Sequence, residues 1–169
     1  KAAEALFVRY EGPIYRVGLR MCRDPEDARE VLQETLLAAA RTLGDFRGES
    51  AVGTWMYTIA RSFCIKLRKK AGRMPTAGGG DGDEDEIALL PDRAALPDEA
   101  AAGHEVGRAL QLAIAELARP YREVLVLRDV EGLTAPEVAA ALGIGVDAVK
   151  SRLHRSRLAV RDKIAPLLD

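Results

Sequence analysis

The side chains best suited to hold a metal ion are two cysteines and two histidines, and they are scattered along the chain. Cys22 and Cys64 form no CxxC pair, and His104 and His154 lie far from both and from each other. A structural zinc site usually needs four such ligands, which here would come from four separate segments. We therefore expect no metal site and no cofactor. We interpret both cysteines as small core residues in a reducing compartment, and no sequence feature supports a disulfide between them.

Catalytic patterns are equally sparse. We find no pair of carboxylates on adjacent faces, no metal cluster and no glycine-rich phosphate loop followed by Lys and Ser or Thr. The glycine run at residues 78–80 has neither the lysine nor the start of a helix after it. The sequence therefore predicts that the protein is not an enzyme.

A basic segment with nearby aromatic residues is the first feature that suggests a ligand. Residues 61–73 hold six basic side chains, and no acidic residue occurs between Glu49 and Asp81. Seven of the eight aromatic residues lie in the first 75 positions, with Phe46, Trp55 and Tyr57 at or beside the loop that precedes the basic helix. Cations that hold phosphates beside rings that stack on bases are typical of single-strand binding. The alternatives are a solvated helix end, and core positions for Trp55 and Phe63 at helical spacing, with Phe46 and Tyr57 left open.

A second basic segment lies in a helix-turn-helix pattern. Thr134 and Glu137 form a capping box, Gly143 suits a tight turn, and a basic helix follows from about residue 146 to 164. Residues 146–163 hold six basic and two acidic side chains. Apolar spacing directs Val149, Leu153 and Val160 inward, which leaves these residues outward in the half that reaches base edges: Lys150, Ser151, Arg152, His154 and Arg155. An ordinary basic helix of a bundle is the alternative.

The elements that must position these residues are all helical, because no stretch alternates with period two and β-branched residues are sparse. In the first part we expect helices at residues 2–10, 14–21, 25–43 and 52–70, with a break at Gly12-Pro13 and a loop at residues 44–53. The apolar face of the helix at residues 52–70 is predicted to consist of Trp55, Ile59, Phe63 and Leu67. In the second part we expect helices at residues 105–117, 120–130, 135–142 and 146–164.

The charge divides the chain into three segments. The 169 residues have a net charge of −1, which taken alone argues against a nucleic-acid partner. Residues 1–75 carry 14 basic and 9 acidic side chains, residues 76–105 carry 1 and 9, and residues 106–169 carry 10 and 8. The acidic middle is rich in Gly and punctuated by Pro, as a flexible linker would be. We predict an all-α protein of two small domains, 1–74 and 104–169, joined by a flexible acidic linker, 75–103.

Membrane insertion and secretion are not expected. No stretch of about 18 uncharged apolar residues is present, and the first residues lack a charged segment followed by an apolar one. The sequence therefore favours a cytoplasmic protein.

Motifs in both parts follow one another in a known order. The first part contains DPEDA at 24–28, LQET at 32–35, FRGES at 46–50 and TWMYTIAR at 54–61. The second contains YREVLVLRDVEGLT at 121–134, EVAAALG at 137–143 and VKSRLHR at 149–155. These blocks resemble regions 2.2 to 2.4 and region 4 of the extracytoplasmic function (ECF, group IV) sigma factors of the sigma-70 family. The resemblance covers both compact parts, with an unmatched linker between them.

The resemblance implies a bacterial RNA polymerase sigma factor that binds the core enzyme and directs promoter recognition, promoter melting and transcription initiation. Contact with the largest-subunit clamp helices would involve Asp27, Glu30, Gln33 and Glu34. Contact with the −10 element would involve Phe46, Arg47, Ser50, Trp55, Tyr57, Arg61, Ser62 and Lys66. The −35 element would be read by the outward residues of the last helix, Lys150, Ser151, Arg152, His154 and Arg155.

The resemblance also implies a contact with the flap of the second-largest polymerase subunit and control by an anti-sigma factor. Three other functions are weighed. A polymerase-independent helix-turn-helix regulator would need its own dimer interface. The motifs expected of a nucleic-acid enzyme are absent from this sequence. The basic recognition helix disfavours a pure protein-binding adaptor.

Overall fold

The computed structural model describes residues 1–72 and 105–168, and every regular element within these ranges is helical. The first part contains α1 (Ala2–Cys22), α2 (Pro25–Thr42), the short 3-10 turn η1 (Leu43–Asp45) and α3 (Val52–Lys70). The second contains α4 (Glu105–Glu116), α5 (Arg119–Leu125), the π-helical turn η2 (Val126–Val130), α6 (Ala135–Leu142), α7 (Val146–Ile164) and η3 (Ala165–Leu167). The all-α prediction is confirmed. The whole of the predicted linker, residues 75–103, lies outside the described residues, as does His104.

Helix α1 runs without interruption through Pro13, so the predicted break at Gly12-Pro13 is wrong. A proline inside a helix removes one backbone hydrogen bond and costs roughly 3 kcal/mol. Directly after it, however, Ile14 and Val17 are buried among α2 and α3. In proteins most helix stability comes from packing of the apolar face, and here that packing outweighs the proline.

The start of α2 is as predicted. The Asp24 carboxylate accepts hydrogen bonds from the backbone N–H groups of Glu26 at 2.7 Å and Asp27 at 3.1 Å, and Pro25 occupies the first helical turn. This cap satisfies donors that the helix cannot satisfy itself. It sets the direction in which α2 leaves α1, so that Ala28 and Val31 are buried and the opposite face is exposed.

The buried face of α3 differs from the predicted apolar face. Trp55, Ile59, Phe63 and Leu67 are only half-buried, whereas the buried positions are Thr54, Met56, Tyr57, Ala60 and Cys64. The reason is that α3 packs against α1 and α2 and also against α6 of the second part, which turns its buried face. The interpretation of both cysteines as core residues is confirmed, because Cys22 and Cys64 are buried with their sulfur atoms 2.9 Å apart.

The helix-turn-helix forms as predicted. Thr134 Oγ1 accepts from the Glu137 N–H at 3.3 Å, and Glu137 accepts from the Thr134 N–H at 2.7 Å. Gly143 ends α6 with a φ of 67°, a left-handed conformation that a residue with a Cβ adopts at a cost. Helix α7 begins three residues later, at Val146.

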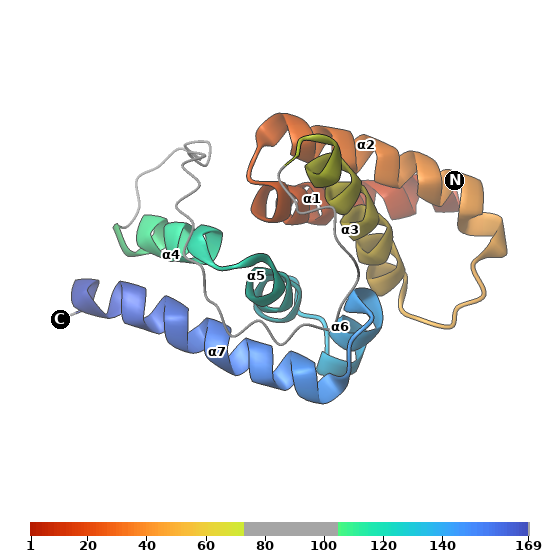
Figure 1. Ribbon diagram of the computed structural model, residues 1–169. Coiled ribbons are helices and arrows are strands. Elements are labelled where there is room, and N and C mark those ends of the chain that lie inside the picture. Colours follow the sequence, from red (N-terminus) through yellow and green to blue (C-terminus); the bar gives the residue numbers. More distant parts are fainter. Residues whose placement is uncertain (73–104, 169) are drawn as a thin grey trace.

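The two parts lie against each other (Figure 1). Helix α1 contacts α5 and η2, and α3 contacts α6, so buried residues of both parts belong to one continuous apolar cluster. The sequence predicted two parts but did not place them. A separate observation is that none of the described helices is long and apolar enough to cross a membrane.

Candidate nucleic-acid interface

The outward half of α7 presents the predicted base-reading residues together. Lys150, Ser151, His154 and Arg155 are exposed and Arg152 is half-buried, while Val149 and Leu153 on the opposite face are buried. The turn at Gly143 and the burial of Val149 and Leu153 therefore determine which face of α7 is exposed to solvent. A basic helix presented in this way after a short turn can enter the major groove of DNA.

Polar contacts hold α7 against α5 and η2. Ser156 donates from Oγ to the Tyr121 carbonyl at 3.0 Å, and Arg155 donates to the Tyr121 hydroxyl at 3.4 Å. Arg157 donates to both carboxylate oxygens of Asp129, at 2.6 and 2.8 Å. This two-point contact raises the pKa of Arg157 through the Asp129 hydrogen bond and keeps its guanidinium charged. The orientation of α7 therefore depends on residues of its own part.

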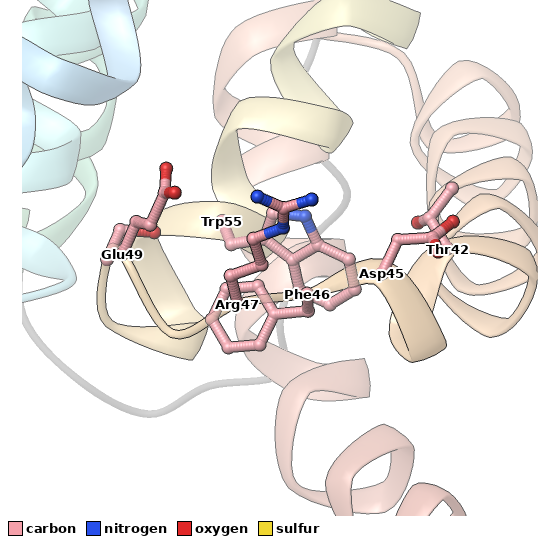
Figure 2. A pocket seen from close by; sticks show the side chains of 7 residues that line it. Thr42, Asp45, Phe46, Arg47, Glu49 and Trp55 are labelled. Atoms are coloured by element: carbon pink, nitrogen blue, oxygen red, sulfur yellow. The ribbon is translucent and has the colours of Figure 1, made fainter.

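The loop before α3 surrounds an open hollow of about 380 Å³ (Figure 2). Its lining is mixed polar and aromatic: Thr42, Asp45, Phe46, Arg47, Glu49, Ser50 and Trp55. The Phe46 and Trp55 rings lie 4.8 Å apart at an interplanar angle of 34°. Figure 2 shows Arg47 beside these rings, with Thr42 and Asp45 to one side and Glu49 to the other. Rings beside a cation in an open hollow can stack on an unpaired base while the cation holds a phosphate.

The exposed face of α3 continues from this loop. Ser62 and Lys66 are exposed, and the Lys66 ammonium lies 4.9 Å from the Phe63 ring centroid. Lys69 and Lys70 follow in the last turn and are also exposed. The cationic end of α3 therefore lies on the same helix as the rim of the hollow.

Two of the predicted −10 residues point elsewhere. Tyr57 is only 5% exposed and donates from its hydroxyl to Glu131 Oε2 at 3.1 Å. Arg61 is half-buried and donates from Nε to Glu123 Oε1 at 3.3 Å. Both acceptors belong to the second part, so the structure places Tyr57 and Arg61 between the two parts.

Buried charge between the parts is the feature that sequence reasoning missed. Arg122 is fully buried, and burial together with Arg23, Arg68 and Arg119 lowers its pKa to about 9. Glu123 beside it is buried as well and favours the charged form of Arg122. The sequence signal that could have indicated this burial is a pair of charged residues, Arg122 and Glu123, directly before an apolar run that begins at Val124.

The face of α2 that was predicted to bind core polymerase is largely open. Glu30 and Gln33 are exposed, and Asp27 and Glu34 are half-buried. Acidic and amide side chains on one exposed helix face suit a polar protein contact. Among the described residues, no group of three or more His, Cys, Asp or Glu side chains could hold a metal ion.

Comparison with known proteins decides the family. The Sigma-70 region 2 family matches residues 6–74, and the Sigma-70 region 4 family matches residues 107–160. The chain is 33% identical over 177 residues to the RNA polymerase sigma-H factor of Pseudomonas aeruginosa, covering 99% of this chain and 89% of that protein. It is 31% identical over 173 residues to the ECF RNA polymerase sigma-E factor of Escherichia coli K12, with the same coverage. The chain belongs to the ECF sigma factors.

Solved structures share the fold. The sigma factor RpoE of Bartonella quintana, solved in complex with the anti-sigma factor NepR, aligns with a TM-score of 0.74 at 19% identity over 96% of both chains. CnrH, solved in complex with the cytosolic domain of CnrY, aligns with a TM-score of 0.66 at 24% identity over 99% of this chain and 88% of that one. An ECF sigma factor is a transcription initiation factor, which binds core RNA polymerase and directs it to promoter DNA.

Proposed function

We propose that residues 104–169 of this sigma factor read the −35 promoter element through α7. The observation that carries this proposal is the exposed row of Lys150, Ser151, His154 and Arg155, opposite the buried Val149 and Leu153. Arg and Lys side chains in the major groove pair with guanine edges, and those that reach phosphates set affinity and salt dependence.

Residues 1–74 bind the −10 element in this proposal. Phe46 and Trp55 take an unpaired base of the non-template strand into the hollow of the loop, and Arg47 and Lys66 contact its phosphates. Ser50, Ser62, Tyr57 and Arg61 complete the surface, the last two after release from the second part. Unstacking the base costs a few kcal/mol, which ring stacking and cation contacts offset.

The remaining surface suits protein partners. The α2 face with Asp27, Glu30, Gln33 and Glu34 binds the clamp helices of the largest polymerase subunit, and the second part binds the flap of the second-largest subunit. An anti-sigma factor controls the protein, as the complex of RpoE with NepR suggests for a protein of the same fold. The protein acts in the cytoplasm, where RNA polymerase is, and catalyses no reaction itself.

Reconstituted transcription tests the proposal. Purified protein and bacterial core polymerase are combined on a library of promoter sequences, and transcripts are sequenced. We expect initiation that depends on the added protein and selects sequences at −10 and −35. Initiation without selectivity, or none above core enzyme alone, contradicts the proposal.

Matched variants separate the surfaces. Lys66→Glu should impair open-complex formation with little change in core affinity, whereas Glu30→Lys should weaken core binding. Arg9→Glu and Glu11→Lys are the controls, because both positions are exposed on α1, outside the proposed contacts. Equal loss of core affinity from Lys66→Glu and Glu30→Lys would contradict the assignment of these surfaces.

A further inference from the structure

The two cysteines of the chain, which the proposed function does not use, meet in the core of the first part. Cys22 is the last residue of α1, and Cys64 lies in α3, 42 positions further along the chain. Their sulfur atoms are 2.9 Å apart, and the two residues are only 6% and 4% exposed. The chain has no third cysteine, so within the molecule each thiol can pair only with the other.

Neighbouring contacts hold the two sulfur atoms in this position. Arg68, one turn after Cys64, donates to the carbonyl of Met21, the residue before Cys22, at 3.3 Å. Arg23 follows at once, and its left-handed φ of 60° begins the turn into α2. A disulfide bond is about 2.05 Å long, so the sulfur atoms need to approach each other by less than about 1 Å. Helices α1 and α3 therefore already place the two thiols where a disulfide can join them.

Burial makes the thiol pair slow to react and protects the product once it has formed. The hydrogen bond with Cys22 and then burial raise the pKa of the Cys64 thiol, while the charge of Arg68 acts in the opposite direction. Because the thiolate is the form that reacts, the closed pair reacts slowly at neutral pH. Cys22 stands at a helix end, where local opening is easiest, so a small reagent reaches the pair when the end of α1 opens.

We propose that Cys22 and Cys64 are a thiol-oxidation site, at which a small-molecule disulfide converts the pair into an intramolecular disulfide that joins α1 to α3. One cysteine thiolate attacks the small-molecule disulfide, which gives a mixed disulfide and releases one small thiol. The other cysteine loses its proton, attacks the protein sulfur of the mixed disulfide and releases the second small thiol. The two cysteines thus lose two electrons and two protons, and the small-molecule disulfide gains them.

The disulfide protects the first part without changing its exposed surfaces. It closes a loop that contains α2 and the segment around the hollow, and such a cross-link stabilises a fold mainly by restricting the unfolded chain. It also removes both thiols from oxidation to sulfinic acid, which thiols do not reverse and which would place an acid in the core. Because both cysteines are buried, the exposed faces of α2 and α3 stay as they are.

Mass spectrometry of the purified full-length chain tests the site. The folded protein is equilibrated with glutathione disulfide, and the remaining thiols are then alkylated in urea. The wild type should lose two hydrogen atoms, take up no alkyl group and stay monomeric on a non-reducing gel, and dithiothreitol should restore both thiols. Cys22→Ala and Cys64→Ala are the matched controls, which should show only a free thiol or a glutathione adduct. Two free thiols, adducts at both cysteines or a disulfide-linked dimer in the wild type overturn the proposal.

An equilibrium measurement shows whether the fold itself favours the bond. The oxidised fraction is measured in mixtures of reduced and oxidised glutathione, with the wild type either folded or unfolded in urea. The equilibrium constant for oxidation should be about 100-fold larger in the folded protein, because the fold holds together two thiols that the unfolded chain rarely brings into contact. No variant is needed, so misfolding of a variant does not affect the result. An equal or smaller constant in the folded protein overturns the proposal.

Binding to core RNA polymerase tests whether oxidation leaves the exposed surfaces intact. The oxidant is removed before mixing, and the affinity of the oxidised wild type should equal that of the reduced protein. Cys64→Ala treated in the same way is the control for effects of the oxidant that do not need the pair. A loss of affinity in the wild type alone, reversed by dithiothreitol, overturns the protective role. Failure of promoter selection would instead contradict the proposed function, which none of these measurements addresses.

Discussion

The two basic helices, α3 and α7, are each 19 residues long but present their charge in different ways. Acidic partners of α7 come from its own part, as with Asp129 for Arg157 and Glu116 for Lys163. Arg61 of α3 is paired with Glu123, which belongs to the other part. The basic face of α7 is therefore set by its own part, whereas that of α3 depends on how the parts are arranged. Positive charge in the sequence does not by itself define an available surface.

The largest expected effect concerns the hollow that the loop before α3 surrounds. Trp55→Ala removes the ring that packs on Phe46 at 4.8 Å. Stacking on an aromatic ring contributes about 1–3 kcal/mol per base, so open-complex formation should fall by up to about 100-fold. Permanganate reactivity of unpaired thymines on a selected promoter measures the loss.

Phe7→Ala is the control for Trp55→Ala. Phe7 is another half-buried aromatic residue packed against the same core, but it does not line the hollow. Its replacement should lower thermal stability while open-complex formation at 25 °C stays near the wild-type level. If both variants lost open complexes to the same degree, stacking of a base in the hollow would not be the reason for the loss.

A smaller effect is expected on α7. Arg152→Ala and Arg155→Ala should each weaken discrimination at −35 by about tenfold, within the 1–3 kcal/mol of a base-edge contact. Competition between duplexes with intact and altered −35 sequences for binding to the holoenzyme measures this loss of discrimination. Arg161→Ala, an exposed arginine two turns further on, should leave discrimination unchanged. Unaltered selectivity in both test variants removes these residues from the contact.

The sequence predicted the second part better than the first. The helix-turn-helix could be predicted because the interactions that form it, the Thr134 cap and the Gly143 turn, act within a few residues. The continuity of α1 through Pro13 and the buried face of α3 depend on packing between distant segments. The same holds for Arg122, Glu123 and Glu131, because the apolar run that follows Arg122 and Glu123 does not say that these side chains will be buried against α1 and α3. Of the proposed −10 surface, the loop residues could be predicted together, whereas the burial of Tyr57 could not.

A still smaller effect should follow from loss of one hydrogen bond between the parts. Tyr57→Phe removes the hydroxyl that donates to Glu131 at 3.1 Å. Burial and then the Glu131 charge raise the pKa of Tyr57 above its ordinary value, so this hydroxyl remains a donor throughout the physiological range. A buried hydrogen bond of this kind contributes about 1 kcal/mol. Urea unfolding of Tyr57→Phe, Glu131→Gln and the double variant should give a coupling energy of that order. Additive effects would mean that the contact does not form in solution.

The smallest effect belongs to the ion pair between Lys163 and Glu116, which joins α7 to α4 at 2.6 Å. Both side chains are about half exposed, at 49% and 46%, so water and salt screen the attraction. The same double-variant cycle with Lys163→Ala and Glu116→Gln should give a coupling below about 0.5 kcal/mol. A coupling as large as that of Tyr57 with Glu131 would remove the distinction between α3 and α7. Burial between the parts would then not be what makes the Glu131 contact strong.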